Sequence, residues 1–561
     1  MSATQPIAVA RLWPTVARVA VPLVLLAIAG ADAQVRVIDM IPRRFGNEIF
    51  QNAEPTLAVN PVNPAVMAAS AYTLGGDICS RAVEAPIFVT RDTGRTWSIV
   101  CKILVDSSAL LPPGDVMLRW SAHGRFLYAT LLWPFNPYTL QIFQTDDPFG
   151  PSDFMQVGVF PKVDQPDLAA IPLRPPTVGQ AGGAAAGGGD AWGTRLFISG
   201  NFMSGDTALG RSSEGTAGVV VIPPQPAKPV PIERRKIAGE NYATRLGAHE
   251  SGVVYALFYS PRPSPNGNFV IEDVVIVRDD SAGISRSPFT ALLDTPIVKG
   301  TSPKGCDGHD GKPGIQIVTC RVVPYAGGAR SFGFQRRVSA NLSLAVDPDD
   351  PKTVWVAWAD SMAKDHYTLH VRRSKDGGRS WSADLVTIQN ATNPALAAGN
   401  KGNIGFLFQA LEQSPSGMRW VTRLYTSTNG FQSRRSYLLA TTDALNPLPV
   451  MQPYIGDYAE LRAVGDRFYG VFSASNLPDT LNFPNGVAFQ RLVDLQRKIP
   501  LNEHGGFTIG ISIDPFFFAV GPAVHPECAA NTRFAARPPM FAMIGRDSTR
   551  RGRALEIGCP P

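Results

Sequence analysis

Short apolar runs, broken at regular intervals by turn-forming residues, dominate the pattern of this chain. In the stretch Asn341–Ile388 they predict four consecutive strands, at Leu342–Val346, Thr353–Ala359, Tyr367–Arg373 and Trp381–Ile388. The sequence DPDDP separates the first two, because its prolines lack an N–H for a β-ladder and its aspartates favour a turn. Four up-and-down strands in about 45 residues match the size of one β-propeller blade.

This unit of a short apolar strand, a turn and a second strand with aromatic residues recurs along the chain. The seven copies begin at Glu54, Asp115, Asp167, Tyr242, Asn341, Asn393 and Ala459. Candidate third strands follow them: PIFVTRD, TLQIFQTDD, AGVVVIP, DVVIVRDD, TLHVRRS, RWVTRLYTS and GVAFQRL. Such repetition predicts a propeller or a solenoid, and the lack of helical periodicity excludes the helical solenoids. We expect an all-β fold, a single β-propeller of four-stranded antiparallel blades, with seven blades preferred and six as the alternative.

Two segments interrupt the repeat. Thr177–Asp190 lies between the first two strands of the third copy and has almost no apolar bulk, which predicts a flexible loop. Ser281–Arg336 separates the fourth copy from the fifth, and we expect it to be an insertion between blades.

One turn motif is more specific than the strand pattern. The sequences TRDTGRTW and SKDGGRSW both fit Ser/Thr-x-Asp-x-Gly-x-Ser/Thr-Trp, with fixed positions Thr90, Asp92, Gly94, Thr96, Trp97, Ser374, Asp376, Gly378, Ser380 and Trp381. The carboxylate can accept N–H groups of its own turn, the glycine tolerates positive φ, and the indole can be buried between blades. The motif resembles the Asp-box, or BNR repeat, of the sialidase superfamily. This resemblance implies a propeller in which the motif is a structural turn away from the active centre.

The first 33 residues have the pattern of a secretory signal peptide. Arg11 and Arg18 precede the apolar run Val19–Gly30, and Ala31–Ala33 fits a cleavage site. The apolar run is about 12 residues long, and a membrane span needs roughly 20. We expect a secreted or periplasmic protein with no transmembrane segment after cleavage, a propeller over residues 34–520 and a C-terminal tail over 521–561.

Six cysteines follow the predicted signal peptide, and an even number in a secreted chain is typical of disulfides. Six cysteines allow fifteen connectivities. We expect the sequential pairs Cys79–Cys101, Cys306–Cys320 and Cys528–Cys559, of which the last would tie down the C-terminal tail.

Neither the distribution of charge nor the placement of the histidines indicates a nucleic-acid-binding surface or a metal site. The formal net charge is +6, and the basic residues are scattered apart from Arg546–Arg553, as on an ordinary solvated surface. His366 and His370 share one face of a predicted strand but have no third ligand nearby in the sequence. We therefore expect no nucleic-acid partner, no metal and no cofactor.

Candidate chemistry gathers where the first strand of each copy begins, because these strand starts converge on the axis of a propeller. The residues there are polar and mostly acidic: Glu54, Asp115, Asp164, Gln165, Glu240, Asn241, Tyr242, Arg337, Asn341, Asn393, Asp457, Tyr458 and Glu460. Paired carboxylates could act as acid and base on a glycoside, with Asp457, Tyr458, Glu460, Glu240 and Tyr242 as catalytic candidates. The alternative is that these groups only satisfy strand ends and line a wet channel.

The resemblance to sialidases sharpens this hypothesis. It implies three arginines for the substrate carboxylate, a Tyr–Glu nucleophilic pair and an Asp acid/base, while the usual Arg-Ile-Pro motif is absent here. Substrate-binding candidates are Arg245, Arg337, Arg462, Asp115 and Glu54. We expect a propeller that recognises glycans at its axial face, with exo-acting, sialidase-like glycoside hydrolysis as one form of that activity. The alternative is a non-catalytic propeller that binds proteins or cell-surface polymers.

Overall fold

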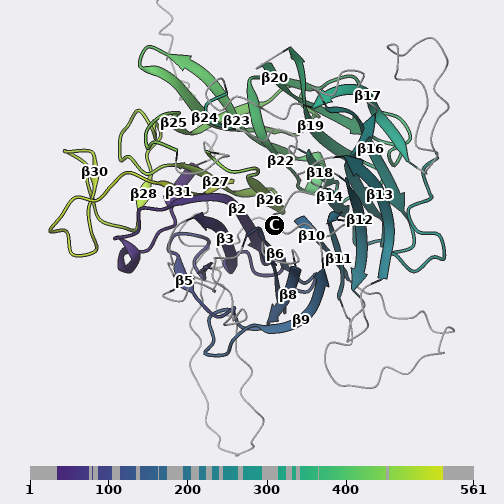
Figure 1. Cartoon of the computed structure of the whole chain (residues 1–561), viewed down its shortest axis with the longest axis horizontal. Helices are drawn as coiled ribbons and strands as arrows, with labels where there is room; N and C mark the ends of the chain where they lie inside the picture. The colour runs from purple at the N-terminus through teal and green to yellow at the C-terminus, as the bar shows by residue number, and fades with distance from the viewer. Residues whose placement is uncertain are drawn as a thin grey trace, which may run out of the picture. The chain divides into compact units, whose positions relative to one another are not determined.

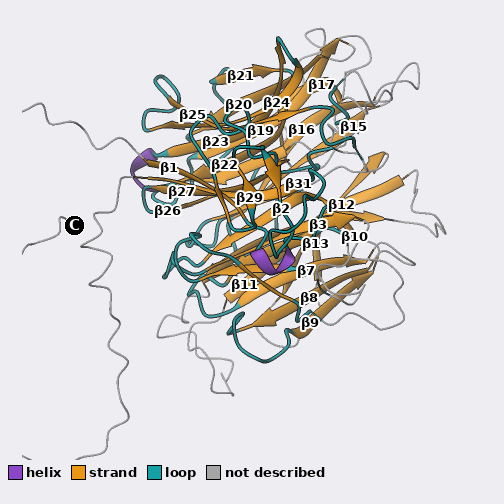
Figure 2. Cartoon of the chain, turned by 90° about the vertical axis from the view of Figure 1, so that its left-hand side faces the viewer, coloured by secondary structure: helices purple, strands orange, loops and turns teal. Residues whose placement is uncertain are grey.

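Strands make up nearly all of the regular structure in the computed structural model of this chain (Figure 2). The structure describes residues 34–74, 79, 86–103, 114–133, 139–161, 163–172, 194–203, 214–222, 230–238, 244–262, 270–293, 314–323, 332–335, 342–363, 366–449 and 454–521. In this part of the chain, the helical elements are two one-turn 3₁₀ segments, η1 (Arg43–Phe45) and η2 (Asn400–Gly402). Among these residues no helix has the length and apolarity that a membrane span requires.

The strands form antiparallel groups of four, each following the order of the sequence. The first two groups are β2 (Gln51–Val59), β3 (Met67–Leu74), β4 (Ile87–Thr90) and β5 (Ser98–Val100), and β6 (Val116–Trp120), β7 (Leu127–Trp133), β8 (Thr139–Thr145) and β9 (Met155–Pro161). The next two are β10 (Val163–Pro172), β11 (Thr194–Met203), β12 (Glu214–Ile222) and β13 (Val230–Ala238), and β14 (Arg245–Ala248), β15 (Val254–Arg262), β16 (Val270–Asp279) and β17 (Ile315–Val323). Two more are β18 (Leu342–Val346), β19 (Val354–Ala363), β20 (His366–Ser374) and β21 (Val386–Gln389), and β22 (Ala391–Ala398), β23 (Ile404–Ser414), β24 (Gly417–Ser427) and β25 (Arg435–Asp443). The predicted all-β fold of four-stranded antiparallel sheets is confirmed.

The first strands of these groups lie next to one another around a common centre (Figure 1). Each first strand contacts the first strand of the next group, in the order β2, β6, β10, β14, β18, β22 and β26 (Glu460–Val464). Strand β26 in turn contacts β2. Apolar side chains fill the space between neighbouring sheets; for example, Trp358 and Leu257 belong to one cluster shared by β14–β19. A ring of sheets closed in this way is the arrangement of a β-propeller.

The two ends of the ring are joined within one sheet. There β26 is followed by β27 (Arg467–Ser475), β31 (Ile513–Gly521) and β1 (Gln34–Asp39). Strand β1 runs antiparallel to β31, from Gln34 opposite Gly521 to Asp39 opposite Phe516. The first strand of the described chain is thereby paired with its last strand, and this pairing closes the ring.

The third strand of this closing sheet was predicted wrongly. The segment GVAFQRL contributes only the two-residue strand β28 (Ala488–Phe489), which pairs with β1, while β29 (Val493–Asp494) and β30 (Ile499–Pro500) form a separate hairpin. The partner of β27 is β31, whose Phe516, Phe517 and Phe518 are all buried. Three adjacent phenylalanines bury more apolar area than the half-polar GVAFQRL can, so packing selects β31.

Two further boundaries differ from the predictions. The expected insertion Ser281–Arg336 contains β17, which pairs with β16 and completes the fourth group of strands. The strand predicted to begin at Trp381 begins at Val386, since Ser380–Leu385 form a bend before the chain joins β20.

The two motif turns, Thr90–Trp97 and Ser374–Trp381, share one set of hydrogen bonds. In each, one aspartate oxygen accepts the backbone N–H of the residue four positions later at 2.9 Å, and the other accepts the hydroxyl of that same residue. Gly94 and Gly378 have φ of 74° and 89°, values that a side chain would strain. Trp97 is 3% exposed and packs on Phe517 of the closing sheet, as expected for an indole buried between blades. Trp381 is only partly buried, which corrects that expectation for the second motif.

One predicted disulfide is present. Cys79 and Cys101 are bonded, with Cα atoms 5.5 Å apart. Cys320 is also disulfide-bonded, but its expected partner Cys306 lies outside the described residues. The predicted signal peptide, the loop Thr177–Asp190, and Cys528 with Cys559 lie outside them as well.

Candidate functional site at the propeller axis

The first strand of each group leaves one backbone edge facing the axis, and those N–H groups need partners. Side chains of the preceding group supply several of them. The bonds join Leu118 N to Thr56 Oγ1 at 3.3 Å, Leu246 N to Asp167 Oδ2 at 2.8 Å, Leu396 N to Ser343 Oγ at 2.8 Å and Leu57 N to Glu460 Oε2 at 2.7 Å. Asp167 and Glu460 therefore bind neighbouring strand edges across the gap between groups.

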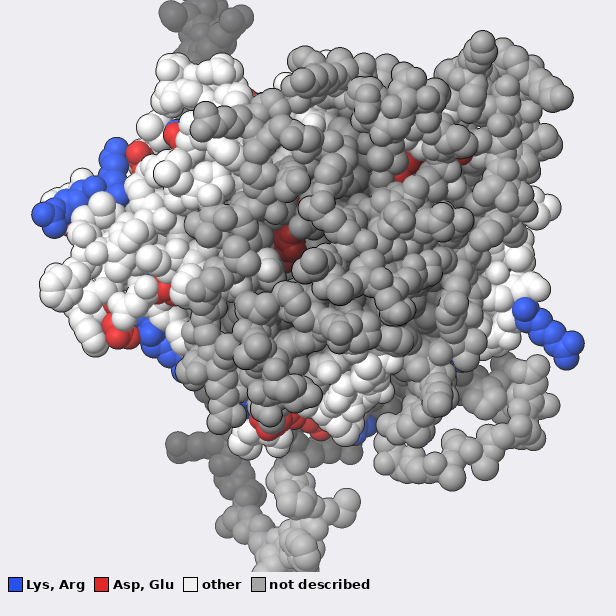
Figure 3. Space-filling model, viewed as in Figure 1, with Lys and Arg blue, Asp and Glu red and all other residues white. Residues whose placement is uncertain are grey.

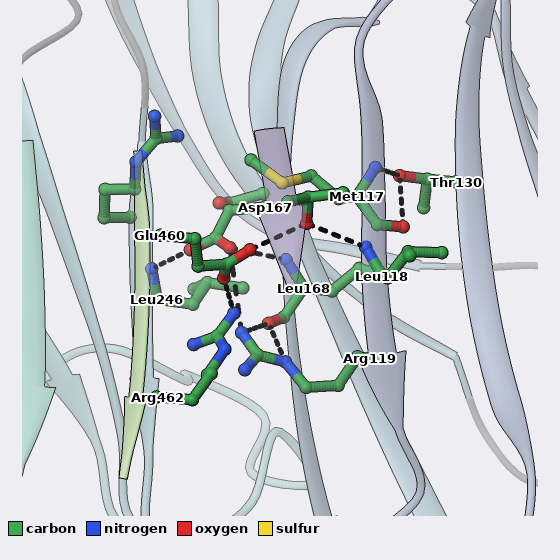
Figure 4. A network of polar contacts seen from close by, with 12 residues as sticks. Met117, Leu118, Arg119, Thr130, Asp167, Leu168, Leu246, Glu460 and Arg462 are labelled. Carbon is green, nitrogen blue, oxygen red and sulfur yellow. Dashed lines mark hydrogen bonds and ion pairs between the residues drawn. The ribbon is translucent and has the colours of Figure 1, made fainter. Parts of the chain in front are cut away.

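Two arginines complement these carboxylates (Figure 4). Arg119 Nε donates to the carbonyl of Leu168 at 2.8 Å, and Arg462 Nε donates to the carbonyl of Leu57 at 3.1 Å. The ion pairs join Arg119 Nη2 to Asp167 Oδ1 at 3.9 Å and Arg462 to Glu460. We call Arg119, Asp167, Glu460 and Arg462 the inner layer, in which two positive and two negative groups balance while holding inner strand edges.

The arginines of this region lie close enough to influence one another. Burial lowers the pKa of Arg462 well below its usual value, and the positive charges of Arg119 and Arg245 lower it further against the opposing effect of Asp167. Burial likewise lowers the pKa of Arg119, and Asp167 partly offsets that. Three arginines thus converge at the axis, but two of them already bind carboxylates and carbonyls of the fold.

The residues just before the inner layer sit on distorted backbone. Glu54, Gln165 and Asn393 have φ of 55°, 47° and 53°, each precedes a proline, and each lies at a register shift between its strand and the next. Non-glycine residues at positive φ are strained and persist only where the surroundings hold them. The same bulge recurs in three groups of strands, which turns a polar side chain into the axial region each time.

Hydrogen bonds tie these bulges to the segment before β26. Asn393 Nδ2 donates to the carbonyl of Gly456 at 3.1 Å, and Gln165 Nε2 donates to Asp457 Oδ2 at 3.4 Å. The backbone N–H of Asp457 donates to Glu54 Oε1 at 3.3 Å. Residues 456–457 are therefore anchored from several sides, which fixes the position of the next residue, Tyr458.

Tyr458 is 7% exposed, and its hydroxyl has no hydrogen-bond partner among the described residues. Burial raises the pKa of Tyr458 well above its usual value, and the carboxylates of Asp115 and Glu54 add to the rise. The Arg245 guanidinium lies 5.6 Å from the centroid of its ring. The phenol is therefore neutral at ordinary pH and keeps an unused proton donor.

We call Glu54, Asp115, Arg245, Asp457 and Tyr458 the axial mouth. A cavity with a volume of about 60 Å³ is lined by residues of both sets, among them Asp167, Arg245, Tyr458 and Arg462, together with Met117 and Asn393. A cavity of about 150 Å³ is needed to hold benzene, so this one has room for a few water molecules. Figure 3 shows acidic atoms recessed near the middle of the face displayed there. The cavity as it stands is too small for a sugar ring.

The structure brings together most of the predicted site residues. Those that meet at the axis are Asp457, Tyr458, Glu460, Arg245, Arg462, Asp115 and Glu54. The predicted residues Glu240, Asn241, Tyr242, Arg337 and Asn341 lie outside the described residues, and nothing is described of the side chain of Asp164.

Two residues of the inner layer, Arg119 and Asp167, were missed as site residues. In the last copy of the repeat, Leu461 has Glu460 before it and Arg462 after it. Asp167 likewise precedes Leu168 in the third copy, and Arg119 follows Leu118 in the second. Aligning the copies on that leucine would have found both.

His370 lies away from this site. Its Nδ1 is 2.8 Å from Asp384 Oδ2, and its Nε2 is 3.0 Å from Asp360 Oδ1. Although burial lowers the pKa of His370, its hydrogen bonds to Asp360 and Asp384 raise it overall. Both ring nitrogens are therefore engaged with carboxylates, and in the described part of the chain no group of three or more His, Cys, Asp or Glu side chains is placed to hold a metal ion.

Comparison with known proteins found structural similarity only. No protein-family model matches the chain, and no curated protein matches its sequence. The chain is similar to the endosialidase of phage phi92, with 11% identity, a TM-score of 0.38 and coverage of 94% of this chain and 77% of that one. It is also similar to the α-L-arabinofuranosidase Arb93A of Fusarium graminearum (11% identity, TM-score 0.34, 79% and 94% covered). A third similar structure is the Hadza microbial sialidase Hz136 (12% identity, TM-score 0.36, 64% and 63% covered). At such values the comparison carries no argument about the site, which is judged from its own residues.

Proposed function

We propose that this protein is a secreted or periplasmic propeller of the sialidase-like type that recognises glycans at its axial mouth. The observation that carries the proposal is the convergence of Tyr458, Arg245, Glu54, Asp115 and Asp457 beside an inner layer whose charges are already paired. Sugar hydroxyls donate to carboxylates and accept from guanidinium and phenol groups. A tyrosine ring offers an apolar face for the sugar ring beside them.

Hydrolysis is the second candidate, favoured by the carboxylates of Asp115 and Glu54 close to the Tyr458 phenol. Paired carboxylates are the usual acid and base of glycosidases. Sialidase activity in particular has less support, because among the described residues a three-arginine clamp would need Arg119 and Arg462, which hold Leu168 and Leu57 instead. The raised pKa of Tyr458 also means that its attack on a sugar would require a base.

Three further features belong to the proposal. We propose seven blades, supported by the contact sequence of first strands through β2, β6, β10, β14, β18, β22 and β26. Cleavage after residue 33 would start the mature chain at β1, and the Cys79–Cys101 disulfide fits an oxidising compartment. The two motif turns serve as Asp-box scaffold elements, with each aspartate bonded within its own turn.

The test combines binding and turnover on the purified mature chain. We expect saturable binding to members of a glycan array, confirmed by calorimetry, and at least a tenfold loss of affinity in Arg245→Gln and in Tyr458→Phe. The matched control is Arg91→Gln, whose side chain is 64% exposed on an outer turn. Release of aryl leaving groups from a panel of aryl glycosides that includes a sialoside would establish the hydrolase candidate. Absence of glycan binding, or binding that ignores both axial variants, would overturn the proposal.

A further inference from the structure

His370 joins two carboxylates that lie on different elements of the chain. Asp360 belongs to β19, and Asp384 belongs to the bend that precedes β21. The Nε2 atom of His370 lies 3.0 Å from Asp360 Oδ1, and its Nδ1 atom lies 2.8 Å from Asp384 Oδ2. An ionised carboxylate can only accept hydrogen bonds, so both contacts are satisfied only when both ring nitrogens carry a proton. The geometry therefore fits the charged, imidazolium form of His370.

Two arginines from two strands add to this set of charges. Arg372 of β20 donates from Nε to Asp384 Oδ1 at 2.6 Å and from Nη1 to the carbonyl of Ile317 on β17 at 3.1 Å. The Nε atom of Arg321, also on β17, lies 3.5 Å from Asp360 Oδ2. The last strand of the fourth group and the fifth group thus meet here, where β17 and β19 are neighbours in one sheet (Figure 1). We call the set the histidine cluster: His370, Asp360, Asp384, Arg372 and Arg321.

Two aromatic residues and one further carboxylate complete the described surroundings. The ring of His370 stacks on the ring of Trp358, with centroids 5.0 Å apart. Tyr259 of β15 stays uncharged at ordinary pH, because burial raises its pKa well above the usual value and the charges of Glu272 and Asp360 add to the rise. Histidine is the side chain that ordinarily titrates near neutral pH. Among the described groups, a change of charge near neutral pH therefore falls on His370.

The two carboxylates differ in their access to solvent. The side chain of Asp360 is 0% exposed, whereas that of Asp384 is 29% exposed. When His370 loses a proton, one of its nitrogens turns a lone pair towards a carboxylate oxygen. A buried acceptor that loses its donor cannot turn to water instead, while a partly exposed one can. The remaining proton therefore stays between His370 and Asp360, and the contact with Asp384 is the one that is lost.

We propose that His370 is a pH-sensitive latch, which in its protonated form holds the bend that carries Asp384 against β20 and releases this bend when it is deprotonated. The bend leads into β21, which pairs with β20 over only four residues, and the Leu385 N–H donates to the Val371 carbonyl at 2.8 Å beside it. These bonds at the outer end of the fifth group are the ones that the latch protects.

The direction of the switch follows from the contacts of the ring. Burial lowers the pKa of His370, but its hydrogen bonds with Asp360 and Asp384 raise it overall above the ordinary value of 6.5. A group of this kind contributes stability that is complete below pH 6.5 and is lost as the pH rises through the pKa of the folded chain. The latch is therefore closed in acid and opens on the alkaline side.

Hydrogen exchange of the purified chain at pH 6 and pH 9 tests the latch. Protection factors, which correct for the intrinsic effect of pH on exchange, are compared for peptides covering 382–389 and peptides covering β24 in the same sample. We expect protection of 382–389 to fall at least about threefold further than that of β24 between the two pH values. The β24 peptides report any loss of stability of the whole propeller.

Two variants and a control sharpen this test. His370→Gln should show the low protection of 382–389 already at pH 6. Asp384→Asn changes a partly exposed side chain, so it keeps the test valid if His370→Gln folds poorly, and it should remove at least half of the pH effect. The matched control is His504→Gln, whose side chain is 81% exposed and which should behave as the native chain does.

Titration of the histidine rings by NMR gives a second measurement. The resonance that is missing in His370→Gln should titrate above pH 6.5, and at a lower pH in Asp384→Asn than in the native chain. A titration at or below pH 6.5 would overturn the proposal. Protection of 382–389 that changes only in step with β24 would overturn it as well, and so would a pH effect of native size in Asp384→Asn.

Discussion

Charged side chains are buried in two regions of this propeller, and the two regions handle them differently. At the axis, Asp167 and Glu460 face Arg119 and Arg462, and backbone groups take up the remaining bonds. At the closing sheet, three carboxylates surround one arginine. The inner layer at the axis therefore balances charge with charge, while the closing sheet has two carboxylates more than its arginine can neutralise.

The closing cluster consists of Asp39, Glu48, Arg491 and Asp514. Arg491 Nη1 bonds Asp514 Oδ2 at 2.7 Å, with both side chains fully buried. Burial, followed by the charge of Asp514, raises the pKa of Glu48 to about 8 and that of Asp39 well above its usual value. The excess negative charge is thus reduced by bound protons, which makes the closure of the ring dependent on pH.

The largest expected effect is loss of the arginine at the closing cluster. Arg491→Met leaves Asp514 without its ion pair and frees the carbonyl groups of Gly46 and Glu48, so we expect a loss of about 3–5 kcal/mol in the free energy of unfolding. Urea unfolding at pH 7 measures it. Arg497→Met, at an exposed position of the same segment, is the control and should change stability by less than about 0.5 kcal/mol. Similar losses in both variants would contradict the role assigned to the buried pair.

The second largest effect is a dependence of stability on pH, which Glu48 of the closing cluster causes. The folded chain holds the Glu48 proton up to a pKa of about 8, against an ordinary value of 4.5. The stabilisation that comes from keeping Glu48 protonated in the folded chain is complete below pH 4.5 and is lost as the pH rises to about 8. At alkaline pH the protein is therefore less stable by up to a few kcal/mol.

The variant Glu48→Gln mimics the protonated form and should flatten that part of the curve, raising the melting temperature at pH 9 relative to the native chain. The exposed control Glu250→Gln should leave the curve unchanged. A melting temperature of Glu48→Gln that still falls in parallel with the native chain between pH 5 and 9 would refute the assignment.

A smaller effect is expected at the axis, where each role can be tested separately. Glu460→Ala removes the acceptor of the Leu57 N–H and the partner of Arg462, and we expect a loss of about 2–3 kcal/mol. Glu460→Gln keeps an oxygen for the Leu57 N–H and should cost about half as much. Thermal unfolding of the two variants decides the point. Equal losses would mean that charge, and not capping of the strand edge, is what Glu460 supplies.

The smallest effect belongs to a carboxylate that lies in neither region. Burial raises the pKa of Asp376, but hydrogen bonds from Ser380, Ser374 and the Arg379 N–H together outweigh burial and lower the pKa to about 2. The contribution of this carboxylate to stability is therefore present above pH 4 and is lost as the pH falls towards 2. Asp376→Ala should cost about 1–2 kcal/mol from unpaired turn N–H groups and leave glycan affinity unaltered. An unchanged melting temperature together with abolished binding would place this turn in the functional surface instead.

Local structure was determined by the sequence itself. The strand Leu342–Val346 has the predicted bounds, and the turn Ser374–Trp381 has its hydrogen bonds within four residues. Apolar runs, prolines and a carboxylate that bonds its own turn act over such short distances that no other part of the chain is needed. The same short range let the sequence mark Tyr458 and Glu460, because both lie next to Ala459, where the last copy of the repeat begins.

Only the tertiary structure decided which distant groups meet. Thr56 and Glu460 bond across 404 positions of sequence, and β31, not the segment GVAFQRL, pairs with β27. Arg462, a predicted substrate-binding residue, supports the neighbouring strand edge at Leu57. These choices depend on the exposed inner edges that a closed ring creates, and on which apolar segment fills its last sheet. Neither exists until the ring is complete, so no local pattern in the chain could specify them.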